Sequence, residues 1–367
     1  MKKKQVVIVM FAAAMAALTG CSGETGAVNV GNTQEVMASE VNAAHKQENQ
    51  SATVWNIPET YTKTIGNAAF NFTVQFPENW KNSKVYKTKA ERITFTKEKL
   101  EQALGKVSYD YEKWQQNKEG GFLSADDYGI MYETELGEHI INCVDLDARD
   151  GNMDKYKTNA ELSFMTKQEA YENILNTLKE MGLELEDATY ICYALEHKTM
   201  QSQEYVMDAD GNQMEEYKKK DWNSEDDCYL FLIRQKVQGA TEYHTYGTEF
   251  VRMEEGNAPI QVYYSKNGME RLDIEKVYRF TKEEETLTLL DFEEITKSVA
   301  KELENRNATS SYRVISAELC LKTPDFGSEM TPVWVFQSEE ITTERTVYPV
   351  TVVINAQNGK LSAMGTR

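Results

Sequence analysis

The residue with the clearest chemistry is Cys21, because a cysteine thiolate is a nucleophile that can accept an acyl-bearing group. It follows a leader with three lysines at positions 2–4 and an apolar run over 6–18. Thr19 and Gly20 come between, and small side chains let an extended backbone lie close inside a peptidase site. The run is shorter than the roughly 20 residues of a membrane-spanning helix. We therefore expect an export signal.

The sequence Leu18-Thr19-Gly20-Cys21 resembles the lipobox of bacterial lipoproteins. This resemblance implies that residues 1–20 are a signal peptide that is removed, and that Cys21 receives a diacylglyceryl group with acyl chains such as palmitate. Two acyl chains hold a protein stably at a bilayer, because each buried methylene contributes about 0.8 kcal/mol. We expect a folded part on the extracytoplasmic face of the cell membrane, held there by lipid on Cys21.

The charge of the chain excludes one class of partner. Its 367 residues contain 59 acidic and 40 basic side chains, which gives a formal net charge of −19. Such a surface repels phosphate backbones, so we expect no nucleic-acid partner. It also repels anionic lipid headgroups, which leaves the acyl chains as the contact with the membrane.

The sequence predicts neither a metal site nor a cofactor. No histidine has a second histidine or a cysteine pair at ligand spacing, which argues against zinc. Two acidic stretches, 145–151 and 208–211, look like calcium loops, but Arg149 and Tyr156 occupy ligand positions in the first and the second fails similarly. No nucleophilic serine turn or glycine-rich phosphate loop is present. The four histidines are His45, His139, His197 and His244.

Four cysteines remain beyond the anchor, at Cys143, Cys192, Cys228 and Cys320. An even number outside the cytoplasm permits disulfides, but four cysteines allow three connectivities and the spacing favours none. Two of the four fall inside expected strands, where a buried thiol behaves as a small apolar side chain. We expect free thiols.

The chain divides by composition into a tether and three folded parts. Residues 21–58 are small and polar, and a flexible chain of this length spans on the order of 30 Å. Residues 59–161 predict a smaller, strand-rich N-terminal domain, beginning with a strand in which Phe70, Phe72 and Val74 alternate with polar residues. A modest helix follows at 97–104.

Residues 162–280 predict a module with one helix and a sheet. Thr166 and Glu169 form a capping pair, apolar residues then repeat at helical spacing, and Gly182 ends the helix. The strands that we expect after it span 188–195, 228–235 and 260–264, the last followed by an Asn-Gly turn.

Residues 281–367 repeat that order, which predicts an internal duplication. Leu290, Asp291, Glu294 and Ile295 predict a capped helix start with a hydrophobic staple. Strands at 312–321, 333–337 and 350–354 follow, and Trp334 is expected to face away from Val333 and Val335. The fold class is therefore α+β, with antiparallel sheets that each pack against one main helix.

The two modules resemble the PepSY-related modules of the YycH and YycI regulators and of many clostridial lipoproteins. The residues that carry the resemblance are Thr331–Phe336 and Val353–Leu361. It covers the C-terminal module well and the middle module loosely. It implies a non-catalytic extracytoplasmic module that acts through protein contact, in the named regulators upon a sensor kinase.

We expect a lipid-anchored binding or regulatory module of the bacterial cell envelope, with no enzymatic activity. Its partner would be an envelope protein such as a sensor kinase or a transporter. Two alternatives remain open. An envelope hydrolase would need two close carboxylates with perturbed pKa values in one cleft, and a solute-binding lipoprotein would need two doubly wound lobes.

Overall fold

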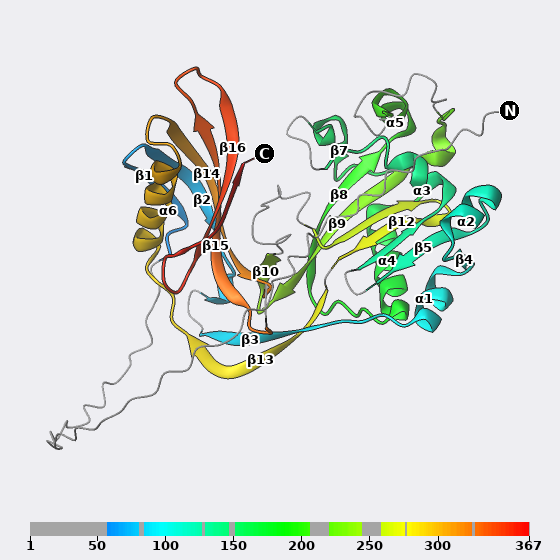
Figure 1. Ribbon diagram of the computed structural model, residues 1–367, viewed down its shortest axis with the longest axis horizontal. Coiled ribbons are helices and arrows are strands. Elements are labelled where there is room, and N and C mark those ends of the chain that lie inside the picture. Colours follow the sequence, from blue (N-terminus) through cyan, green and yellow to red (C-terminus); the bar gives the residue numbers. More distant parts are fainter. Residues whose placement is uncertain are drawn as a thin grey trace, which may run out of the picture. The chain divides into compact units, whose positions relative to one another are not determined.

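The computed structural model describes residues 57–80, 84–126, 129–146, 151–205, 220–243, 258–275, 277–324 and 327–366 (Figure 1). Within these residues the protein is α+β, as the sequence predicts. Fifteen strands are connected by hydrogen bonds into two sheets and a linking strand, and two further strands form a separate ribbon.

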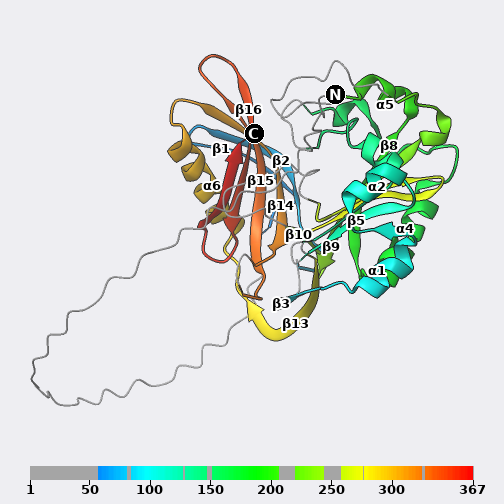
Figure 2. The same cartoon turned by 45° about the vertical axis from the view of Figure 1, so that its right-hand side comes forward.

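The middle sheet contains eight strands, all antiparallel except for the β4–β5 pair. In order across the sheet they are β4 (Val107–Ser108), β5 (Gly121–Ala125), β6 (Ile130–Glu133), β12 (Gly268–Ile274), β11 (Ile260–Ser265), β9 (Cys228–Val237), β8 (Ala188–Leu195) and β7 (Lys157–Thr158). Helices α1 (Lys97–Leu104) and α4 (Lys167–Met181) lie side by side over one face, where Ile174 and Leu178 are fully buried against Phe231 (Figure 2).

The opposite face of the middle sheet is covered by shorter helices that the sequence pattern does not predict. They are α3 (Glu135–Ile140) and α5 (His197–Gln203), while α2 (Tyr111–Asn117) packs beside β4 and β5. Ile140 and Met200 are buried there with Leu230 and Tyr263. Each of these helices has seven residues or fewer, which is too short for a helical apolar repeat to stand out.

The C-terminal sheet is built around α6 (Phe292–Arg306). Its strands, in order, are β1 (Thr60–Ile65), β2 (Ala68–Gln75), β14 (Ser311–Lys322), β15 (Thr331–Ile341), β16 (Val347–Asn355) and β17 (Leu361–Thr366). Trp334 is buried on the helix side, whereas Val333 and Val335 belong to a small cluster on the other side. The expected alternation at these three residues is confirmed.

The two helix-and-sheet units have the same chain order. After α4 the strands β8, β9, β11 and β12 follow as antiparallel neighbours, with α5 inserted before β9 and a strand at 240–243 inserted after it. After α6 the strands β14, β15, β16 and β17 follow as antiparallel neighbours without insertion. Both helices have 15 residues. The repeated unit expected from the sequence is therefore a helix followed by a four-stranded meander.

The two helix starts differ. Thr166 accepts from the Glu169 amide, and the Glu169 carboxylate accepts from the Thr166 amide in return, so the expected capping box is formed. Asp291 begins α6 without a side-chain hydrogen bond, so the reciprocal bonds expected there are not formed. Leu290 and Ile295 still pack in the same core, which keeps the hydrophobic part of that motif.

Residues 59–161 do not form the separate domain expected for them; they are divided between the two sheets. β2 pairs in parallel with β14, and β6 pairs with β12. The physical reason is the apolar face of β2, whose phenylalanines pack against aromatic residues of the C-terminal core. Phe72 lies 6.2 Å from Phe336 between ring centroids, and Tyr61 lies 5.2 Å from Phe292.

The four described cysteines are buried free thiols. Cys143 and Cys228 share one cluster of the middle sheet, Cys192 lies in the cluster on the other face, and Cys320 lies in the C-terminal sheet. Burial raises the pKa of Cys192 to about 12, so at neutral pH this thiol is protonated and acts as packing.

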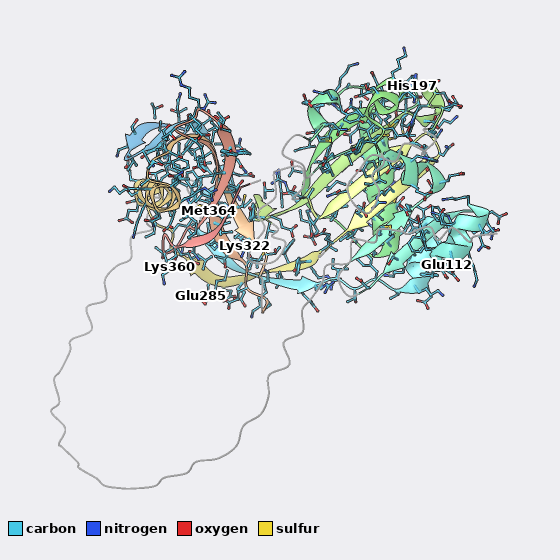
Figure 3. All side chains as sticks on the ribbon, turned by 45° about the horizontal axis from the view of Figure 1, so that its top comes forward. Glu112, His197, Glu285, Lys322, Lys360 and Met364 are labelled. Carbon is cyan, nitrogen blue, oxygen red and sulfur yellow. The ribbon has the colours of Figure 1, made fainter. Side chains whose placement is uncertain are left out.

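A two-stranded ribbon carries the chain between the two cores. β3 (Val85–Arg92) leaves the C-terminal core and leads to α1, and β13 (Tyr278–Leu287) leads back to α6. Ion pairs cross the ribbon between Lys87 and Glu285, which is labelled in Figure 3, and between Lys89 and Glu283. Exposed pairs of this kind contribute at most about 1 kcal/mol each.

Two glutamine side chains fasten this ribbon to the end of β9. Gln238 donates through Nε2 to the Tyr86 carbonyl at 2.7 Å, and its Oε1 accepts from the Tyr86 amide at 3.2 Å. Gln235 makes the same pair of bonds with the backbone of Tyr278, at 3.0 and 3.2 Å. Each glutamine side chain therefore makes the two backbone hydrogen bonds that a residue of a neighbouring strand would make. We call Gln235 and Gln238 the glutamine clasp.

Gln238 also forms the turn between β9 and β10 (Ala240–Tyr243). Gln238 and Gly239 both have left-handed backbones, with φ of 54° and 83°, as a two-residue hairpin turn of type I′ requires. The Gln238 carbonyl accepts from the Trp80 indole at 2.7 Å. β10 then pairs in parallel with the end of β14, which connects the two sheets.

β10 contains a buried carboxylate, Glu242. The residue is fully buried, and within the described part of the chain neither carboxylate oxygen has a hydrogen-bond partner. Burial raises the pKa of Glu242 to about 8. The backbone amide of Gln235 and the guanidinium of Arg234 lower the pKa, but they offset only part of the rise. The carboxyl is therefore largely protonated at neutral pH.

Replacing Gln238 with Met should lower the free energy of unfolding by about 2 to 3 kcal/mol, because methionine has a similar length but leaves the Tyr86 amide and carbonyl without their partners. Urea unfolding curves of the purified protein measure this difference. Gln357→Met, at an exposed position, is the matched control and should change stability by less than about 0.5 kcal/mol. Equal stability of the two variants would contradict the role of the clasp.

Glu242 predicts a pH dependence of stability with a definite sign. Its pKa in the folded protein, about 8, lies above the ordinary value of 4.5, so the unfolded chain loses this proton first. Between about pH 4.5 and 8 the carboxyl should therefore lower the free energy of unfolding by up to about 1.4 kcal/mol per pH unit as the pH rises. Comparing unfolding curves of the natural protein and Glu242→Gln at several pH values tests this, since only the natural protein has that slope. Parallel profiles would disprove it.

Candidate binding site beside the ribbon

The lipid-anchor residues Leu18, Thr19, Gly20 and Cys21 lie outside the described residues. So do His45, His244, residues 147–150 and residues 208–211, which include most of the acidic stretches. Among the described residues, no helix is long and apolar enough to cross a membrane. The same residues contain no group of three His, Cys, Asp or Glu side chains that could hold a metal ion.

His197, labelled in Figure 3, is the first residue of α5 and follows β8. His139 lies in α3, with its Nδ1 4.0 Å from Oε1 of Glu204 at the end of α5. Asp227 Oδ1 lies 2.7 Å from His197 Nδ1 and also accepts from the His197 amide at 2.6 Å. This carboxylate therefore ties down the first residue of α5. No hydroxyl or thiol of the described residues is hydrogen-bonded to the His197 ring, so these groups do not make a catalytic triad.

One hollow of the middle sheet, with a volume of about 290 Å³, contains an arginine that is already neutralised. Arg271 lines it, is 15% exposed, and forms a fork with Asp273 at 2.7 and 3.1 Å. Its third bond, of 2.5 Å, goes to Glu133. Burial raises the pKa of Glu133 above its ordinary value, and the charge of Arg271 offsets only part of that rise. These two acids flank a cation and do not face each other, so the pair that a hydrolase needs is not formed here.

A larger hollow, of about 470 Å³, lies where β9, β13 and the segment between α4 and β8 meet. We call it the ribbon hollow. Its volume falls in the range of small-molecule sites, and its position at a junction between two cores is typical of such sites. The apolar part of its lining comes from Ile93, Val237, Tyr278 and Phe280.

The ribbon hollow has charged side chains of both signs that are not paired with each other. Arg279 and Lys236 line it, as do Glu186 and Asp187. Lys236 is half-buried and the other three are exposed. In the described part of the chain none of these four makes an ion pair within 4.0 Å. Two positive and two negative charges are therefore available to a ligand.

The other polar groups of the ribbon hollow already have partners. Gln235 and Gln238 are bound in the clasp, and Glu184 pairs with Lys179 at 2.5 Å. Lys282 lies 3.6 Å from the centre of the Tyr86 ring, in a cation–π contact. The free charges are thus the groups that distinguish this hollow from the one beside Arg271.

Sequence reasoning did not find the ribbon hollow. Its lining comes from segments near residues 88, 185, 236 and 280, which only the ribbon and the β9–β10 hairpin bring together. One signal was available in the sequence, since Glu184, Glu186 and Asp187 directly follow the glycine that ends α4. Acidic turns are common for backbone reasons, however, and that signal alone is weak.

Comparisons with known proteins give a fold and no function. No family model and no curated protein matches the chain. Among solved structures, the chain is similar to an uncharacterized protein from Eubacterium rectale, with a TM-score of 0.52 and 18% sequence identity. The similarity covers 83% of this chain and 93% of that one. At this level of identity it shows that the two proteins share a fold.

Proposed function

We propose that the protein is a lipid-anchored, extracytoplasmic binding module of the bacterial cell envelope, without enzymatic activity. The leader and the Leu18–Cys21 sequence support the anchor, and the small, polar residues that follow support a tether of about 30 Å. The PepSY-like pattern at 331–336 and 353–361 supports a role in binding.

The observation that carries the binding role is the ribbon hollow. It combines an apolar lining with four charged side chains that are unpaired among the described residues, at the junction of two cores. Charged side chains that have no partner within the protein can interact with complementary groups of a ligand, and the apolar lining beside them can bury part of it, which supports a ligand site. The hollow beside Arg271 lacks this property because its cation is already bonded to two acids.

Replacing Cys21 with Ala should abolish lipid attachment, because alanine has no thiol to accept the diacylglyceryl group. We expect an uncleaved precursor, or a soluble protein, where the natural protein is found in the membrane fraction. Fractionation and mass spectrometry of the N-terminus measure both properties. Ser22→Ala is the matched control and should be processed and anchored normally. A Cys21→Ala protein that is still cleaved and anchored would contradict the proposal.

The ribbon hollow should be occupied in the cell. A photo-crosslinking phenylalanine analogue at Phe280, which lines the hollow, should form an adduct in intact membranes. The same analogue at Ile315, a 47% exposed position on β14, is the control and should give no such adduct. Mass spectrometry of the labelled peptide identifies what was captured. Indistinguishable products from the two positions would argue against a binding site at the hollow.

A further inference from the structure

Glu242 on β10 is an exception among the buried polar groups. It is fully buried, and of the buried carboxyl groups that the structure describes it is the one whose two oxygens both lack a hydrogen-bond partner. Buried polar groups in folded proteins are nearly always bonded, so such an exception calls for an explanation. A neutral carboxyl can be buried in this way, whereas a carboxylate without partners is costly to bury. Ionisation of Glu242 therefore favours any local opening that brings its side chain to water.

On its own face of the sheet, Glu242 has uncharged neighbours on both adjoining strands. The register of the β9–β10 hairpin brings Gln235 opposite Glu242, and the register of β10 with β14 pairs Glu242 with Leu321. The Gln235 side chain is already bonded to the backbone of Tyr278, and Leu321 is a buried apolar residue. Neither side chain is therefore available to the carboxyl group.

The charged residues of the same strands near this point lie on the opposite face, because successive side chains of a strand alternate between the two faces of a sheet. They are Arg234 and Lys236 of β9, and Glu318 and Lys322 of β14, the last labelled in Figure 3. Arg234 still lowers the pKa of Glu242, but burial raises that pKa more, to about 8. The closed junction between β10 and β14 therefore favours the protonated carboxyl.

Of the two pairings that β10 makes, the one with β14 is the weaker. It is parallel, involves only the last two residues of β10, and is extended by a bond of 3.0 Å from the Thr323 amide to the Tyr243 carbonyl. Parallel pairing is slightly less stable per residue than antiparallel pairing. The antiparallel pairing with β9 is closed by the two-residue turn and fastened to the ribbon by Gln238. A local opening that hydrates Glu242 is therefore expected between β10 and β14.

We propose that β10 is a pH-dependent latch between the two sheets: ionisation of Glu242 releases β10 from β14, while the β9–β10 hairpin stays closed. In the open latch the hydrated carboxyl titrates near its ordinary value of 4.5, whereas in the closed latch its pKa is about 8. The closed latch is therefore fully favoured below about pH 4.5. Between there and about pH 8, each pH unit shifts the equilibrium up to about tenfold toward the open latch. The latch does not depend on whether the ribbon hollow binds a ligand.

Hydrogen–deuterium exchange of the full-length protein between pH 5.5 and 8, followed by mass spectrometry, tests the latch. Peptides with Thr323 report the β10–β14 junction, and peptides with Trp334, in the middle of β15, report unfolding of the sheet. We expect the Thr323 amide to exchange well before the Trp334 amide. The ratio of its exchange rate in the natural protein to that in Glu242→Gln should rise up to about tenfold per pH unit, since the ratio cancels the intrinsic effect of pH on exchange. Equal exchange of the two amides at every pH, or a constant ratio, would overturn the inference.

Two further variants assign the effect to Glu242 itself. Glu318→Gln removes one negative charge from a half-buried position on the opposite face of β14, and it should keep the pH dependence of the natural protein. Glu242→Met replaces the carboxyl with an apolar side chain of similar length, should hold β10 on β14 up to pH 8, and serves in place of Glu242→Gln if that variant does not fold. A Glu242→Met protein that opens with rising pH, or a Glu318→Gln protein that no longer does, would disprove the assignment.

Discussion

The connection between the two hydrophobic cores depends on one constraint, which is that the backbone of the ribbon must find hydrogen-bond partners beyond its own two strands. The glutamine clasp supplies them on the side of β9. Gln238 satisfies both the amide and the carbonyl of Tyr86, and Gln235 does the same for Tyr278. Two side chains three residues apart thus take the place of an adjoining strand.

The clasp also determines what is left for a ligand. Both glutamine side chains are bonded to the ribbon backbone, so the polar groups of the ribbon hollow that remain available to a ligand are mainly charged side chains. The left-handed turn at Gln238 and Gly239 reinforces this arrangement, since it sends β10 to the edge of β14 while it holds the Gln238 side chain against β3. The polar residues that hold the ribbon in place are therefore different from those that remain available to a ligand.

Local patterns predicted most of the regular elements. The helix expected at 97–104 is formed at those residues, and the strand expected at 188–195 coincides with β8. Thr166, Glu169 and Gly182 set the ends of α4 as their types require. These successes share a cause, because capping, left-handed glycine and apolar alternation act within a few residues of the chain.

Pairing between distant strands was beyond the reach of the same reasoning. Nothing near Phe70 in the sequence indicates that β2 lies beside Val314, and the resulting assignment of 59–161 to one domain was wrong. The ribbon hollow was missed for the same reason, since four strands of the middle sheet lie between Glu186 and Arg279 in the chain. Periodicity tells which face of a strand is apolar; the identity of its neighbour depends on the whole core.

The parallel pairing of β2 with β14 has a consequence for the newly made chain, which emerges with its N-terminus first. Residues 68–75 have only β1 beside them until residues 311–318 have also emerged. Throughout that interval the apolar side chains at 70, 72 and 74 lack their final covering, and a two-stranded hairpin is marginally stable in water. The apolar face of β2 therefore stays partly uncovered until the C-terminal sheet is complete, whereas the strands of the middle sheet all precede residue 275 and can pair earlier.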